Sequence, residues 1–141
     1  MFINIVIGNP PYQENNGGGN GIGANSLYEK FIDLGVTLGV NYVSMITKSS
    51  WFSGNNYKNI RELLLKDNKL RILVDYTNPQ DVFSKMDNID GGVSYFLWEK
   101  SPKTQGYFKN ITNDKEVISN IHSDLGVIIR YDMLYNVRLC K

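Results

Sequence analysis

The chain is 141 residues long, with 42% hydrophobic and 21% charged residues, and this ordinary globular composition excludes general disorder. The 15 Lys and Arg residues nearly balance the 14 Asp and Glu residues, so a basic surface over the whole domain is excluded and any polyanion must be held locally. One cysteine, Cys140, excludes an internal disulfide framework, and no apolar run reaches the length of a membrane span. With no signal peptide recognisable, these features predict a single cytoplasmic domain without a membrane partner.

The first half of the chain predicts a strand, a loop and a helix. Residues 3–7 are apolar and β-branched, which predicts a buried strand closed by the two prolines that follow. Residues 13–25 are rich in Gly and Asn and predict a mobile loop. A capping box starting at Ser26 predicts a helix over residues 27–39. Its expected apolar face consists of Leu27, Phe31, Leu34 and Leu38.

The rest of the chain continues the alternation of strand and helix. Further strands are predicted over residues 42–47, 70–76, 93–98 and 107–111, with a helix over residues 57–66. This order predicts an α/β fold with a largely parallel sheet, to which the closely spaced last strands add an antiparallel edge. Residues 115–121 are expected to form a short helix and residues 127–130 an extended segment.

Four residues after the first predicted strand carry the chemistry: Asn9, Pro10, Pro11 and Tyr12. The carboxyl end of a strand is where open α/β sheets bind ligands. Two consecutive prolines fix two φ angles and remove two backbone donors, while their carbonyl oxygens remain acceptors. The amide oxygen of Asn9 adds another acceptor, and Tyr12 adds an aromatic face. This combination suits a planar ring that bears an exocyclic amino group.

The motif resembles the catalytic motif of the N6-adenine DNA methyltransferases, in which Asn, Asp or Ser precedes Pro-Pro-Tyr/Phe after a strand. The resemblance is closest to the Eco57I-like group of type IIG and type I restriction–modification systems, and it covers residues 2–100. Further family features follow in the same order and spacing. They are Leu27-Tyr28-x-x-Phe31, Ser50-Trp51, Arg61-x-x-Leu64-Leu65, a strand ending in Asp75, and Val82-Phe83 before a Gly-rich hairpin and a Tyr-Phe-Leu strand.

The resemblance implies only part of a Rossmann-like class I S-adenosylmethionine-dependent methyltransferase fold. Residues 1–112 correspond to the C-terminal, catalytic half of its sheet with flanking helices. Residues 113–141 correspond to an extension or a linker toward a missing target-recognition domain. In the family the loop that binds S-adenosylmethionine precedes the catalytic strand, and here few residues precede Asn9. S-adenosylmethionine is therefore the implied cofactor, but no residue of this chain is assigned to bind it, or to bind a metal.

The resemblance also implies roles for individual residues. Asn9, Pro10, Pro11 and Tyr12 are the implied catalytic residues, acting on an adenine flipped out of double-stranded DNA. The Asn9 side chain and the Pro10 carbonyl would accept hydrogen bonds from the amino group, while Tyr12 stacks on the base. Phe83 is the implied second substrate-binding aromatic. Together these roles imply site-specific N6-adenine methylation by a fragment or a split piece of an enzyme.

Other functions remain open from the sequence. The chain can be an inactive remnant that serves as a dimerisation or interaction module, or a methyltransferase acting on RNA or on a protein amide nitrogen. A half-sheet leaves a strand edge and an apolar face without partners, so we expect association with the missing N-terminal half or with a second copy.

Overall fold

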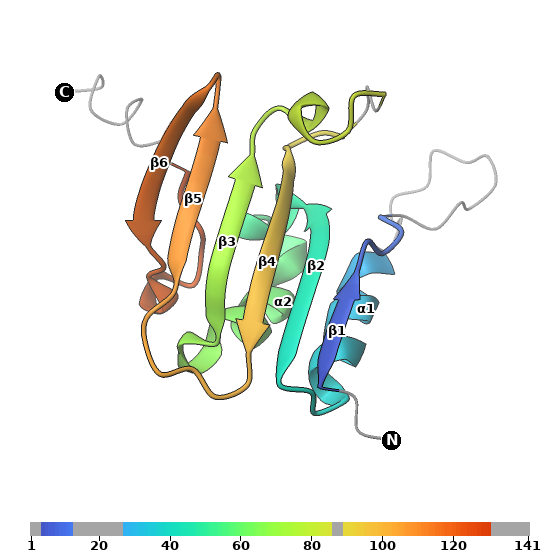
Figure 1. Ribbon diagram of the computed structural model, residues 1–141, viewed down its shortest axis with the longest axis vertical. Helices are drawn as coiled ribbons and strands as arrows, with labels where there is room; N and C mark the ends of the chain where they lie inside the picture. Colours follow the sequence, from blue (N-terminus) through green and yellow to red (C-terminus); the bar gives the residue numbers. More distant parts are fainter. Residues whose placement is uncertain (1–3, 13–26, 86–88, 131–141) are drawn as a thin grey trace.

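The computed structural model describes residues 4–12, 27–85 and 89–130, and within them the chain forms one six-stranded sheet with the order β1-β2-β4-β3-β5-β6 (Figure 1). The glycine-rich loop and the Ser26 capping box fall outside the described residues. The elements are β1 (Ile5–Gly8), α1 (Leu27–Thr37), β2 (Tyr42–Lys48), α2 (Lys58–Leu65), β3 (Leu70–Tyr76), β4 (Val93–Glu99), β5 (Tyr107–Thr112) and β6 (Lys115–Asn120). No helix in these ranges is long and apolar enough to cross a membrane.

The first three strands run in the same direction, as predicted. β1 pairs parallel with β2, and β4 pairs antiparallel with both β2 and β3. The antiparallel strand therefore lies inside the sheet, whereas the sequence analysis placed antiparallel pairing only at its edge. The reason is that β4 is apolar along its length, with Val93, Phe96 and Trp98 at most 4% exposed, so burial favours a central position.

Both helices cover the same face of the sheet (Figure 1), and the core lies between these helices and the sheet. The prediction of which side of α1 packs on the sheet is wrong. The residues that pack on the sheet are Tyr28, Ile32 and Gly35, whereas Phe31 and Leu34 are 42% and 55% exposed. The helix has two apolar sides, and the side with glycine allows the closer approach, because a Cβ on Gly35 would lie 3.2 Å from side-chain atoms of Met45 and Val43.

The first strand is not buried, contrary to expectation. Ile5 and Ile7 are 53% and 78% exposed, and only Val6 packs against the core. β1 forms the edge of the sheet, because no other strand in the described part of the chain pairs with its outer side. An apolar sequence therefore lies where a polar strand would normally be expected.

The helix predicted over residues 115–121 is also wrong, because these residues form β6. Asn113 and Asp114 have φ angles of 48° and 61°, which make a two-residue turn between β5 and β6. Ile121 and Ile128 then join the core, and the extended segment predicted over residues 127–130 belongs to no strand. The extension expected after residue 112 thus begins as part of the sheet.

Candidate active site

The Asn9-Pro10-Pro11-Tyr12 motif lies at the carboxyl end of β1 (Figure 1). Since β1, β2 and β3 are parallel, the segments that follow them meet at the same edge of the sheet. These segments are the motif itself, the 3₁₀ helix Ser49–Phe52 after β2, and the loop over residues 77–85 after β3, which contains Phe83. We call this end of the sheet, where the parallel strands finish, the catalytic edge. The topology thus brings all five sequence-predicted site residues to one end of the sheet.

Within the motif, the two groups proposed as acceptors differ in burial. Asn9 is exposed and Pro10 is buried. The side-chain amide of Asn9 makes no hydrogen bond to any residue that the structure describes, so its oxygen is available as an acceptor. Pro10 is fixed by burial beside it, and its ring restricts φ, so the local backbone loses little entropy when a ligand binds.

Tyr12 packs into a row of three tyrosine rings. Its ring meets Tyr28 edge-on, with centroids 6.4 Å apart and planes at 88°, and Tyr28 stacks on Tyr57 at 6.0 Å. The hydroxyl of Tyr12 is buried and has no hydrogen-bond partner among the described residues. Burial raises the pKa of Tyr12, so the side chain is a neutral phenol and contributes its ring rather than a charge.

Tyr28 connects this row to the segment after β2. It is fully buried in α1, and its hydroxyl shares a hydrogen bond with Oγ of Ser50 at 3.3 Å. Burial raises the pKa of Tyr28 well above the usual tyrosine range. The sequence analysis identified Tyr28 only as a letter of a family pattern. The signal that Tyr28 faces inward was its helical spacing with Ile32 and Gly35, which lie four and seven residues further along α1.

Phe83 is half-buried and follows a tight turn. The side chain of Asn78 accepts a hydrogen bond from the backbone of Gln80, and the Phe83 amide donates to the Pro79 carbonyl at 2.9 Å. These bonds fix the backbone that carries Phe83. Its ring makes no ring–ring contact within the described residues.

A buried carboxylate lies beneath the catalytic edge. The sequence analysis named Asp75 only as the end of a strand in the family pattern and did not predict its burial or its partners. Asp75 at the end of β3 is fully buried, yet every oxygen has donors. Ser49 Oγ donates at 2.5 Å and Asn110 Nδ2 at 2.9 Å. Arg130 donates through Nε and Nη2 at 2.7 and 2.8 Å. These partners come from distant positions in the chain, and no local pattern joins them.

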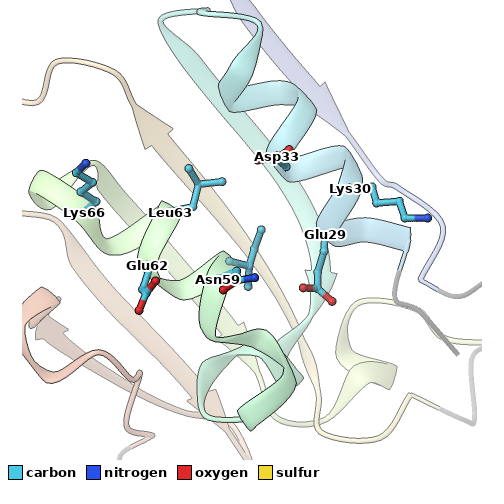
Figure 2. A pocket seen from close by; sticks show the side chains of 8 residues that line it. Glu29, Lys30, Asp33, Asn59, Glu62, Leu63 and Lys66 are labelled. Carbon is cyan, nitrogen blue, oxygen red and sulfur yellow. The ribbon is translucent and has the colours of Figure 1, made fainter. Parts of the chain in front are cut away.

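The cavities among the described residues are small or lie away from the Asn9-Pro10-Pro11-Tyr12 motif. A groove of about 570 Å³ runs between α1 and α2, lined by charged side chains including Glu29, Asp33 and Glu62 (Figure 2). It contains none of the motif residues, so it is not a candidate for the reaction. A smaller cavity of about 150 Å³ lies at the catalytic edge between Ser50, Ser53 and Arg130.

Comparison with known proteins identifies the family. Residues 2–83 match the family model described as "Eco57I restriction-modification methylase". The chain belongs to this methylase family. An "Uncharacterized adenine-specific methylase" of Mycoplasma pneumoniae (strain ATCC 29342 / M129 / Subtype 1) is 33% identical over 104 residues, which cover 72% of this chain and 24% of that protein. The chain therefore spans about a quarter of the length of this relative.

Several solved structures share the fold of this chain. The DrdV–DNA complex aligns with a TM-score of 0.60 at 12% identity, covering 92% of this chain and 18% of that one. The type IIG restriction endonuclease BpuSI gives 0.53 at 15% identity over 74% of this chain and 15% of that one. The type I methyltransferase subunit from Streptococcus thermophilus gives 0.51 at 15% identity, covering 94% and 31%. The mixed sheet with its helices is that of class I methyltransferases.

The described residues do not by themselves fit S-adenosylmethionine, the methyl donor that this fold implies. Residues 4–12 contain no carboxylate that could hold ribose hydroxyls, and no described strand lies beyond β1 to carry one. A glycine-rich loop between a strand and a helix that could cradle the donor is not present in residues 27–85 or 89–130 either. We therefore assign none of the described residues to the methyl donor.

Proposed function

We propose that this chain is the catalytic part of a site-specific N6-adenine DNA methyltransferase of a restriction–modification system. One observation carries the proposal: an Asn9 amide oxygen with no hydrogen-bond partner among the described residues, a buried Pro10 and a supported Tyr12 ring lie together at the carboxyl end of β1. The adenine-specific methylase relative supports the choice of base.

The residues of this chain act by holding the acceptor. The Asn9 side-chain oxygen and the Pro10 carbonyl accept the two hydrogens of the adenine amino group, which polarises the nitrogen and directs its lone pair out of the ring plane. Pro11 keeps the backbone rigid. Tyr12 stacks on one side of the flipped base and Phe83 contacts it from the loop after β3, which offsets the cost of unstacking it from the duplex. The amino nitrogen releases one proton to solvent during or after attack on the methyl group, so no charged base is required, in agreement with the neutral Tyr12.

The methyl group would come from S-adenosylmethionine held by a partner polypeptide or by a further part of the protein. Exposed apolar side chains around the edge of β1 support such a partner. They are Ile5 and Ile7 on the strand, Phe31 and Leu34 on α1, and Leu38 directly after α1, each 42–78% exposed. We propose that the cofactor-binding half of the methyltransferase fold covers these side chains and pairs with the outer edge of β1.

The proposal is tested by joining this chain to the cofactor-binding half and the recognition region of a relative and measuring N6-methyladenine in DNA by mass spectrometry. We expect Asn9→Ala to lower the rate on the order of a hundredfold or more, because it removes an acceptor aimed at the amino group. Asn120→Ala is the matched control, since Asn120 is an exposed asparagine at the end of β6. Full methylation by the Asn9→Ala enzyme would refute the assigned mechanism.

A second candidate function is an interaction module without catalysis, which the exposed apolar residues around β1 also favour. The same assembled protein separates the two functions. A complex that forms but methylates neither DNA nor RNA nor a protein amide, with or without Asn9, would support the module and exclude the enzyme.

A further inference from the structure

The Asp75 carboxylate joins three separate segments at the catalytic edge. Ser49 comes from the end of β2, Asn110 from β5, and Arg130 from the segment that follows β6. Arg130 binds both carboxylate oxygens, and its Nη2 also donates to the Gly91 carbonyl in the turn before β4. A buried carboxylate with all its donors in place is rigid, because any partner that leaves exposes an unpaired charge to an apolar surrounding.

Two further contacts attach the same segment to the loop after β2. Arg61 of α2 is buried, has no carboxylate partner among the residues that the structure describes, and donates to the Gly126 carbonyl at 3.0 Å and to the Trp51 carbonyl at 2.9 Å. The Ile128 amide donates to the Phe52 carbonyl at 3.0 Å. Residues 126–130 are therefore held against the 3₁₀ helix Ser49–Phe52 at both of its ends.

The backbone around Arg130 is shaped to admit its guanidinium. The guanidinium carbon lies 5.4 Å from the centroid of the Phe52 ring. Gly92 has φ +86°, and a Cβ there would lie 2.9 Å from Arg130 Nη2 and 2.5 Å from the Tyr76 carbonyl oxygen. A side chain at this position would displace Arg130 or the end of β3, so glycine is needed beside the ion pair.

The anchored helix also reaches the proposed catalytic tyrosine. Ser49 binds Asp75, and the next residue, Ser50, shares a hydrogen bond with Tyr28. Tyr28 supports the ring of Tyr12 edge-on. A continuous series of direct contacts thus leads from Arg130 through Asp75 and the Ser49–Ser50 pair to Tyr12.

We propose that Asp75 and Arg130 are positioning residues for transfer: their ion pair fixes the Ser49–Phe52 helix, whose Ser50 holds Tyr28 against Tyr12. The role of Tyr12 in this inference rests on the proposed function. The pair touches no substrate. It sets the angle at which the Tyr12 ring meets the base, and it keeps residues 126–130 attached to the catalytic edge.

The first test needs only this chain and no activity. Arg130→Met retains an unbranched side chain over Phe52 but removes the ion pair. The matched control is Arg71→Met, because Arg71 binds Glu99 at 3.0 Å at the other end of the sheet, where β3 begins and β4 ends. By hydrogen exchange we expect Arg130→Met to increase exchange at least tenfold at the amides of residues 49–52 and 128, and Arg71→Met to leave these amides unchanged. Unchanged exchange there in Arg130→Met would overturn the proposal.

The second test uses the assembled enzyme and a fluorescent adenine analogue at the target position. We expect Arg130→Met to weaken capture of the flipped base about tenfold and to add less than twofold once Tyr12→Ala is present, because both changes act through the same ring. Losses that multiply fully would overturn the positioning role. If Tyr12→Ala alone leaves capture of the base unchanged, the proposed function fails. The hydrogen-exchange experiment still tests whether the Asp75–Arg130 ion pair fixes the Ser49–Phe52 helix.

A third variant covers the case in which Arg130→Met does not fold. Ser50→Ala removes only the hydrogen bond between the helix and Tyr28, so the core keeps its side chains. We expect it to weaken capture of the base in the Tyr12 enzyme and to have no further effect in the Tyr12→Ala enzyme. Equal effects in both backgrounds would overturn the proposed connection.

Discussion

The hydroxyl of Tyr12 is a buried polar atom that the fold does not satisfy. Since the ring alone supports stacking, removing the oxygen relieves a desolvation cost without changing the ring contact with Tyr28. We expect Tyr12→Phe to raise the free energy of unfolding by up to about 1 kcal/mol in urea titrations. Tyr12→Ala should lower it instead, because the edge contact is lost. Destabilisation by Tyr12→Phe would mean that the hydroxyl has a partner in solution.

The same two tyrosines predict how stability depends on pH. Burial raises the pKa values of Tyr12 and Tyr28 in the folded chain above the ordinary value of 10.0. Above pH 10 the unfolded chain loses these protons while the folded chain keeps them, so the free energy of unfolding must fall as the pH rises further. Urea titrations at pH 9 and pH 11 should show this fall, and Tyr28→Phe should reduce it. An unchanged fall in Tyr28→Phe would contradict the assignment.

Among the single-residue changes considered at this scale, we expect loss of the Asp75 charge to lower the free energy of unfolding the most. Asp75→Asn leaves the Arg130 guanidinium without a counter-charge in a buried place, and removing one partner of such a pair costs about 3–5 kcal/mol. The exposed pair of Lys58 and Glu62 is the control, for which Glu62→Gln should change stability by no more than about 0.5 kcal/mol. Similar losses in thermal unfolding for both variants would contradict the special status of the buried pair.

At the scale of elements, the strands were predictable where side chains alternate or where an apolar run is closed by turn residues, as in β2 and β3. β6 was missed because the signal lay in its turn: Asn113 and Asp114 adopt positive φ, which Asn and Asp tolerate, and the strand itself is almost wholly exposed. The face of α1 was misassigned because the sequence has two apolar sides. Only the sheet decides between them, through the space that Gly35 leaves.

The candidate site shows the same division between local and distant information. Asn9, Pro10, Pro11 and Tyr12 are adjacent in the chain, so a sequence pattern includes all of them. The surroundings of Asp75 require Ser49, Asn110 and Arg130 to meet across 26, 35 and 55 positions of the chain. Such contacts can be recognised only once the order of the strands in the sheet is known. The sequence therefore predicts the motif but not the hydrogen bonds around Asp75.

Two glycines at strand ends test how closely the elements approach. A Cβ on Gly106 would lie 2.1 Å from the Leu70 carbonyl oxygen, where β5 begins beside β3. Gly8 at the end of β1 has no atom within 4 Å of its Cβ position. We expect Gly106→Ala to lower the free energy of unfolding by more than about 2 kcal/mol and Gly8→Ala to change it by less than about 0.5 kcal/mol, measured in urea. Equal effects would contradict the register of β5 on β3.

At the scale of the whole molecule, the distribution of apolar surface is uneven. The helices cover one face of the sheet (Figure 1). The strand register places Tyr95, Tyr107 and Ile118 together on one face of the sheet, and their side chains are 40%, 41% and 65% exposed. The exposed apolar side chains of β1 and α1 are different, because they border a strand edge that pairs with no other strand in the part of the chain that the structure describes. An edge that combines both features favours strand addition over simple hydrophobic contact.

Association through this edge gives the last prediction. Ile7 is 78% exposed on β1, so a charge there costs the folded chain little but would be buried by any polypeptide that pairs with the strand. We expect the chain to associate, with itself or with the cofactor-binding half, and Ile7→Lys to abolish this association in light-scattering measurements. Ile118→Lys is the control, because Ile118 is 65% exposed on β6 at the far edge of the sheet. If both lysine variants associate like the parent chain, the β1 edge is not the contact. If only Ile118→Lys prevents association, the partner binds at the β6 edge, on the other side of the molecule from the proposed adenine site.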